Sequence, residues 1–172
     1  ARRGQWWYYA RTFEGKQYGV QCRCPVTDPD DWTPPLLDEA TEIPGEQVLL
    51  DQNAEAAGHD FFALGAAGVS PDGNILAYSV DVVGDERYTL RFKDLSTGEL
   101  LADEIAGIGA GVTWATDNST VYYITVDAAW RPDTVWRYRI GAGLQAEQVY
   151  HEEDERFWLS VGRTRSDAYV LS

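Results

Sequence analysis

The sequence has little of the chemistry that metal sites, disulfides and histidine-based catalysis need. Its 172 residues include two cysteines, two histidines and no methionine. Cys22 and Cys24 lie two apart on a predicted strand, so their side chains share a face but are badly placed to bond each other. We therefore expect reduced thiols, as in a cytoplasmic protein. Neither His59 nor His151 has neighbours that complete a zinc or catalytic site, so we predict no metal and no cofactor.

Basic residues are also scarce, because 14 lysines and arginines stand against 28 acidic residues and leave a net charge of −14. A surface that binds nucleic acid needs a surplus of positive charge, so we expect no nucleic-acid partner. No apolar run is long enough to span a bilayer, and the N-terminal residues do not form a signal peptide, so we expect no membrane association. The absence of methionine, with a strand pattern that stops at Ser172, indicates a piece of a longer protein.

No catalytic motif is complete. Gly68 to Asp72 begins like a Gly-x-Ser-x-Gly nucleophile elbow, but it has aspartate at the second glycine position and leads into a strand. The glycines of 107–112 break the spacing of a dinucleotide-binding loop. The adjacent carboxylates Asp85 and Glu86 fall on a predicted hairpin turn rather than in a cleft. We therefore assign no catalytic, cofactor-binding or metal-binding residue, and the substrate-binding residues stay unknown.

What the sequence does contain is a repeated unit of short strands and turns. In residues 68–107 a Ser-Pro-Asp-Gly turn precedes an apolar run, and the next run alternates apolar and polar residues with period two. The signals recur with Asp117 placed 45 residues after Asp72 (117 − 72), within the period of about 40–50 residues of a four-stranded propeller blade. A third copy of the turn and strand begins at 165–171. We predict an all-β fold, a partial β-propeller of four-stranded antiparallel blades.

We expect a single partial β-propeller domain over residues 1–172. The blade-like units are predicted at about 4–67, 68–110 and 111–157, with the start of a further blade at 158–172. The first unit contains a loop at 25–44 that is rich in proline and aspartate, with a short helical turn around 36–41. A tolerated surface insertion explains this loop better than a binding role. The remaining expected segments are strands at 4–12, 17–24 and 47–50, a helical turn within 51–58, strands at 75–80, 88–93, 121–126, 134–140 and 147–150, and a solvated acidic turn at 152–155.

Taken in order, these residues resemble the N-terminal propeller region of the prolyl oligopeptidase family of serine peptidases, and its oligopeptidase B (protease II) branch most closely. The resemblance runs from Gly4 to about Leu171, and it rests on an ordered series of motifs, because Ser-Pro-Asp-Gly alone occurs in many propellers. The series consists of Trp6-Trp7-Tyr8-Tyr9-Ala10-Arg11-Thr12, Glu14-Gly15-Lys16-Gln17-Tyr18, Gly58-His59-Asp60-Phe61-Phe62, Ser70-Pro71-Asp72-Gly73, Leu76-Ala77-Tyr78-Ser79, Gly84-Asp85-Glu86-Arg87-Tyr88-Thr89-Leu90, Asp94-Leu95-Ser96-Thr97-Gly98, Arg131-Pro132 with Val135-Trp136-Arg137, and Asp154-Glu155-Arg156-Phe157.

The resemblance implies a seven-bladed propeller that limits entry to the hydrolase domain of a cytoplasmic enzyme. Such an enzyme cleaves short peptides through a Ser-Asp-His triad, after Lys or Arg in the oligopeptidase B branch. The triad and the main specificity pocket belong to the α/β-hydrolase domain, which is absent here, so no catalytic residue is carried over. The implied partners are that domain of the same parent chain and short peptide substrates.

Other interpretations stay open. A relative that cuts after proline would share much of this region. A non-enzymatic propeller that mediates protein interactions is the alternative, and the test is whether the gene continues into a domain bearing Gly-x-Ser-x-Gly. A secreted sugar-binding propeller is disfavoured by the lack of a signal segment. An open propeller exposes sheet faces and edges, so we also expect the chain to self-associate.

Overall fold

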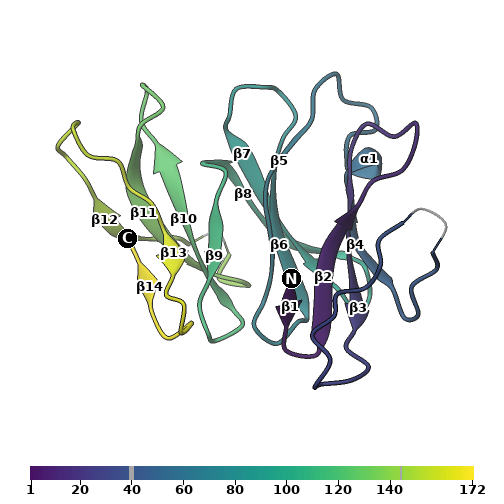
Figure 1. Cartoon of the computed structure of the whole chain (residues 1–172). Helices are drawn as coiled ribbons and strands as arrows, with labels where there is room; N and C mark the ends of the chain where they lie inside the picture. Colours follow the sequence, from purple (N-terminus) through teal and green to yellow (C-terminus); the bar gives the residue numbers. More distant parts are fainter. Residues whose placement is uncertain (39–40, 144) are drawn as a thin grey trace. The chain divides into compact units, whose positions relative to one another are not determined.

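A computed structural model describes residues 1–38, 41–143 and 145–172. The regular secondary structure of this part of the chain is almost all β-strand, as the alternating pattern predicts (Figure 1). The chain divides into two compact units, Ala1–Gly58 and His59–Ser172, which are described separately. Within the described ranges, no helix has the length and apolar character needed to cross a bilayer.

The first unit is built on a four-stranded antiparallel sheet in the order β1-β2-β3-β4. Cys22 and Cys24 are free and buried on β3, and burial raises the pKa of the Cys22 thiol to about 11. That thiol is therefore protonated and unreactive at neutral pH. Asp51 caps the short helix after β4 by accepting a hydrogen bond from the Asn53 amide (2.9 Å). The elements are β1 (Arg2–Arg3), β2 (Trp6–Arg11), β3 (Val20–Pro25), β4 (Gln47–Asp51) and α1 (Gln52–Glu55).

The long loop between β3 and β4 is tied down by arginines of the neighbouring strands. Arg11 on β2 pairs with Glu46 (3.0 Å) and donates a hydrogen bond to the Asp38 carbonyl (2.8 Å). Arg2 on β1 reaches the other half of the loop. The helical turn predicted around 36–41 falls partly on residues 39 and 40, which lie outside the described residues.

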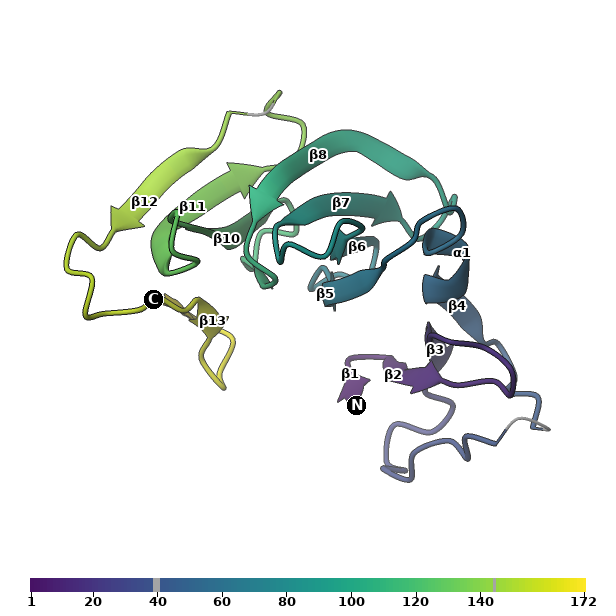
Figure 2. The same cartoon turned by 90° about the horizontal axis from the view of Figure 1, so that it is seen from above.

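The second unit contains two complete four-stranded antiparallel sheets and a two-stranded hairpin. In both complete sheets consecutive strands are neighbours, so β5 and β8 are the edges of one sheet (Figure 2), and β9 and β12 are the edges of the other. The first sheet consists of β5 (Ala63–Val69), β6 (Ile75–Asp81), β7 (Tyr88–Asp94) and β8 (Leu100–Ile108). The second consists of β9 (Val112–Trp114), β10 (Thr120–Val126), β11 (Pro132–Arg139) and β12 (Glu147–His151), and the hairpin of β13 (Gly162–Arg163) and β14 (Val170–Leu171).

The first of these sheets begins at Ala63, ahead of the boundary expected at Gly68. Its strand β5 reads Ala-Leu-Gly-Ala-Ala-Gly-Val and has few of the β-branched and aromatic residues that mark strands in a sequence. It is extended because it pairs with β6 from Ala63 to Val69, with a bulge between Leu64 and Ala66. Tertiary pairing, not local propensity, therefore decides its conformation.

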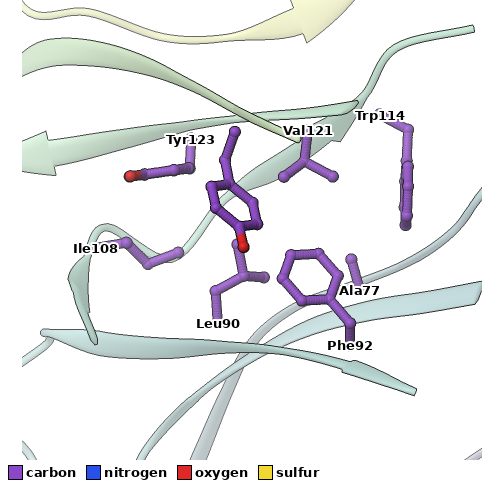
Figure 3. Close-up of a cluster of buried hydrophobic side chains, with 8 residues drawn as sticks. Ala77, Leu90, Phe92, Ile108, Trp114, Val121 and Tyr123 are labelled. Carbon is purple, nitrogen blue, oxygen red and sulfur yellow. The ribbon is translucent and has the colours of Figure 1, made fainter. Parts of the chain in front are cut away.

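The core of the second unit lies between its two complete sheets (Figure 3). Phe92 of β7 sits edge-on to Trp114 of β9 (ring centroids 6.3 Å apart) and stacks on Tyr138 of β11 (6.2 Å). Aromatic side chains thus fill the space between packed sheets, where each buries a large apolar area. The other members of the cluster are Ala77, Leu90, Ile108, Val121 and Tyr123.

The turns that follow the first strand of each sheet share one backbone feature. Gly73, Asn118 and Asp167 take positive φ angles of 80°, 61° and 57° in the three successive turns. Glycine, asparagine and aspartate tolerate this conformation better than other residues, which explains why these turns differ in sequence but agree in shape. The Asp72 amide also donates to the Asn118 side chain (2.9 Å), which links the first two turns.

Candidate functional site

One end of the second unit gathers three connections. In a four-stranded antiparallel sheet whose consecutive strands are neighbours, three features lie at the same end. They are the start of the first strand, the connection between the second and third strands, and the end of the last strand. In the two complete sheets this end carries the β6–β7 connection (residues 82–87), the β10–β11 connection (127–131) and the segment after β12 (152–158), as Figure 1 shows. We call these residues the acidic end, because acidic side chains outnumber basic ones in them.

The β6–β7 connection is organised by a buried carboxylate at the end of β6. Asp81 accepts hydrogen bonds from the amides of Val83 (2.8 Å), Gly84 (2.8 Å) and Glu86 (2.9 Å). Burial acts to raise the pKa of Asp81, but these amides favour the ionised form more strongly, and the net effect lowers it. The connection is therefore a fixed turn that presents the carboxylates of Asp85 and Glu86 to solvent.

Trp130 joins the connections of the two sheets. Its indole Nε1 donates a hydrogen bond to the Asp85 carbonyl (2.7 Å), and the Arg87 guanidinium lies 5.0 Å from the ring centroid. The side chain remains 45% exposed, and the backbone has a φ of 60°. A bulky residue in this conformation is strained. The ring contacts hold it there, so the strain is located at the junction of the two connections.

Arg131 fixes the third segment. Its guanidinium pairs with Asp127 (3.1 Å) and donates to the carbonyl oxygens of Glu152 (3.1 Å), Asp154 (3.3 Å) and Phe157 (3.2 Å). The Arg131 amide is the main reason that the pKa of Asp127 is lowered. Only 9% of Arg131 is exposed, and its side chain, together with backbone hydrogen bonds from Glu152 to Asp133 (2.8 Å) and from Leu159 to Pro132 (3.0 Å), holds the segment after β12 in place.

The surface of the acidic end combines carboxylates with exposed apolar side chains. Val83, Phe157 and Trp158 are 75%, 57% and 73% exposed. The carboxylates of Glu153 and Glu155 are exposed beside them. Such a surface attracts cationic groups and offers aromatic faces on which they can rest.

Asp133, Thr134 and His151 have the composition of a hydrolase triad, but their hydrogen bonds are not arranged as in one. Thr134 Oγ1 donates to Asp133 (2.9 Å) and lies 2.8 Å from His151 Nδ1. A hydroxyl has one proton, and that of Thr134 is used in the bond to Asp133, so the hydroxyl is not donating it to the imidazole. His59 is exposed. No group of three or more His, Cys, Asp or Glu side chains within the described ranges is placed to hold a metal ion.

Sequence reasoning located part of this end. Asp85 and Glu86 lie on a connection between strands, as predicted, and the acidic run 152–155 follows β12. The roles of Trp130 and Arg131 were missed. Arg131 acts on carbonyl oxygens more than twenty residues away, and no pattern in the sequence announces such contacts.

Comparison with known proteins gives a consistent result. All of residues 1–172 match the family model described as prolyl oligopeptidase, N-terminal beta-propeller domain. The chain is 40% identical to dipeptidyl aminopeptidase BI of Pseudoxanthomonas mexicana, over 96% of this chain and 23% of that protein. It is 32% identical to Protease 2 of Moraxella lacunata, over 98% of this chain and 24% of that protein.

Comparison with solved structures gives relatives of the same family. Oligopeptidase B from Trypanosoma brucei with covalently bound antipain matches with a TM-score of 0.84 and 30% identity, over 98% of this chain and 22% of that one. Oligopeptidase B from Leishmania major matches with a TM-score of 0.86 and 26% identity, over the same shares. The chain thus spans about a quarter of the length of the relatives it matches.

Proposed function

Because the chain belongs to the prolyl oligopeptidase family, through its N-terminal β-propeller domain, we propose that it is the substrate-gating segment of a serine-type oligopeptidase. The parent enzyme hydrolyses short peptides, after Lys or Arg, in the cytoplasm. The segment itself carries no catalytic residue and belongs to a seven-bladed propeller. The observation that carries the proposal is the match of the whole chain to this domain of peptidases.

The geometry of the acidic end supports a gate that works by size and charge. Asp81, Trp130 and Arg131 hold its three connections through hydrogen bonds to backbone groups, so the rim is firm. A firm rim admits peptides that fit through it and rejects folded proteins. Its carboxylates raise the local concentration of basic peptides and so speed their entry.

Topology supports the position of the hydrolase domain. In each complete sheet of the second unit the first strand begins and the last strand ends at the acidic end. A domain joined by the chain to a propeller made of such sheets is attached at that end. The partner proposed for the acidic end is therefore the α/β-hydrolase domain of the same parent chain, with peptide substrates between the two.

A peptidase assay tests the proposal. The full-length product of the gene and the 172-residue chain are compared on matched peptides that carry arginine, lysine, citrulline or proline before the scissile bond. We expect cleavage by the full-length protein alone, after arginine and lysine. Cleavage after proline only would refute the proposed specificity, and no cleavage by the full-length protein would favour the non-enzymatic interaction propeller.

The gating role has its own prediction. Replacing Glu86, Glu153 and Glu155 by glutamine in the full-length enzyme should lower kcat/KM for arginine peptides about threefold at low ionic strength, without lowering kcat. The matched control is Glu99→Gln, on the β7–β8 connection at the opposite end, which removes an exposed charge and should have little effect. If kcat/KM for arginine peptides does not change with ionic strength, steering by the acidic end is refuted.

A further inference from the structure

A pocket of about 240 Å³ lies in the first unit, beneath the long loop between β3 and β4. Its lining is mainly apolar and includes Trp7 of β2, Pro25 at the end of β3, and Pro35 and Ile43 of the loop. Ile43 is only 8% exposed. Pockets for drug-sized molecules start at about 300 Å³, so this one has the size for a single long side chain.

The pocket is formed by a loop that the sheet holds in place. The Arg2 guanidinium donates to the carbonyl oxygens of Pro29 (2.9 Å) and Asp31 (3.1 Å). It also lies 4.2 Å from the centroid of the Trp32 ring. At the far side of the loop the Arg11–Glu46 ion pair provides a second attachment. Two arginines thus fix a segment whose composition suggested a tolerated insertion.

Two carboxylates line the pocket at its exposed rim, Asp28 and Asp31. Asp31 accepts a hydrogen bond from the Thr33 amide (2.8 Å), and Asp28 accepts one from the Asp30 amide (2.9 Å). Hydrogen bonding from Thr33 lowers the pKa of Asp31. Arg2 donates its hydrogen bonds to carbonyl oxygens of the loop, and its charge adds to the lowering of the Asp31 pKa. The rim therefore keeps negative charge above an apolar floor.

We propose that this pocket binds the basic side chain of a peptide, with the alkyl stem of lysine or arginine against Trp7 and Pro35 and the charged head between Asp28 and Asp31. Alkyl stems pack on apolar surfaces while their charged ends stay at the water boundary. The whole chain has a net charge of −14, which further favours a cationic ligand. The site lies in the first unit and is independent of the proposed gate in the second.

The test is a titration of the 172-residue chain with N-acetyl-arginine methylamide, followed by NMR signals of the Trp7 indole and of the Thr27 and Thr33 amides. The neutral isostere N-acetyl-citrulline methylamide is the control ligand. We expect a dissociation constant of about 1 mM for the arginine probe, as for a small ligand with few contacts. Exposed carboxylates contribute modestly to the binding of a cation, so the citrulline probe should bind about fivefold more weakly than the arginine probe.

Variants separate this site from general attraction to an acidic protein. Asp28→Asn with Asp31→Asn keeps an acceptor oxygen for each turn but removes both charges, and should weaken arginine binding about fivefold. Asp30→Asn is the control, because this exposed neighbour in the same turn does not line the pocket. The proposal is overturned if citrulline binds as tightly as arginine, if Asp30→Asn weakens binding as much as the double variant, or if the pocket signals do not shift.

Discussion

Trp130 shows how one residue can store strain where two sheets meet. Its φ of 60° costs about 1 kcal/mol for a bulky side chain such as tryptophan. The hydrogen bond from its indole to Asp85 and the contact with Arg87 offset that cost. Strained residues that tertiary contacts hold in place are concentrated at functional surfaces, which agrees with the position of Trp130 in the acidic end.

The strain at Trp130 predicts that a glycine variant is more stable than an alanine variant, which is the reverse of the usual order. Trp130→Ala and Trp130→Gly both lose the ring, but glycine also relieves the backbone. We expect the glycine variant to be about 1 kcal/mol more stable than the alanine variant in urea unfolding. Trp158 is the control, because its φ is not positive: there alanine should be at least as stable as glycine. The same order at both positions would contradict the prediction.

Asp117 gives a pH dependence with a defined sign. Burial acts to raise its pKa, but the Thr120 hydroxyl and the amides of Ser119 and Thr120 outweigh this and lower the pKa to about 2. Because the folded pKa lies below the ordinary value of 3.8, the ionised group stabilises the fold above about pH 4. That contribution is lost as the pH falls toward 2.

We therefore expect Asp117→Asn to lower the free energy of unfolding by about 1 kcal/mol at pH 7, a small amount because the residue is exposed. The difference from the unmodified chain should shrink as the pH falls from 4 toward 2. Urea unfolding at several pH values measures it, with Glu99→Gln as a control of equal charge change. A difference that stays constant down to pH 2 would show that the Asp117 charge contributes nothing.

At the scale of elements, Arg131 is the side chain that bonds the segment after β12 at three carbonyl oxygens, in addition to two backbone hydrogen bonds. Lysine at position 131 would keep the charge but could not bond Asp127 and three carbonyl oxygens at once. We expect Arg131→Lys to speed hydrogen exchange about tenfold at the Leu159 amide, which bonds the Pro132 carbonyl (3.0 Å). Arg137→Lys, which affects an exposed ion pair with Glu147, is the matched control. Equal exchange in both variants would mean that Arg131 does not hold the segment.

The elements also show how far the sequence determines the fold. Strands with alternating side chains, such as β7 and β11, were predicted because one face is buried and the other is not. No strand was predicted over β5, and the blade-like unit was expected to begin at Gly68, because alanine and glycine carry no strand signal. The strands β1 and β13 were not predicted for a related reason, because a strand of two residues is too short to show an alternating pattern.

In the candidate site, too, the sequence predicts some features and not others. The carboxylates of Asp85, Glu86 and the run 152–155 are visible in the sequence, and their position in turns follows from turn chemistry. The contacts of Trp130 and Arg131 depend on how separate sheets are placed side by side. The local sequence contains no record of that placement, so the surface charge was predictable but the groups that fix it were not.

At the scale of the whole molecule, exposed apolar side chains and net charge act against each other. Trp158, Tyr169 and Leu171 of the second unit are 73%, 70% and 58% exposed. Exposed apolar surface of this kind favours association between copies. A net charge of −14 opposes it, and salt screens this repulsion between charges farther apart than the Debye length, which is about 10 Å at 0.1 M. Association should therefore increase with both protein concentration and salt.

We expect light scattering to show a weight-average mass above that of the 19.2 kDa monomer at high protein concentration, and the excess should grow as salt is added. Trp158→Ser with Tyr169→Ser should reduce it. Trp32→Ser is the control, because Trp32 is equally exposed, at 70%, but lies in the first unit against Arg2. A monomer at every concentration and salt level would refute self-association. Equal effects of the two sets of variants would show that Trp158 and Tyr169 are not the residues through which the copies associate.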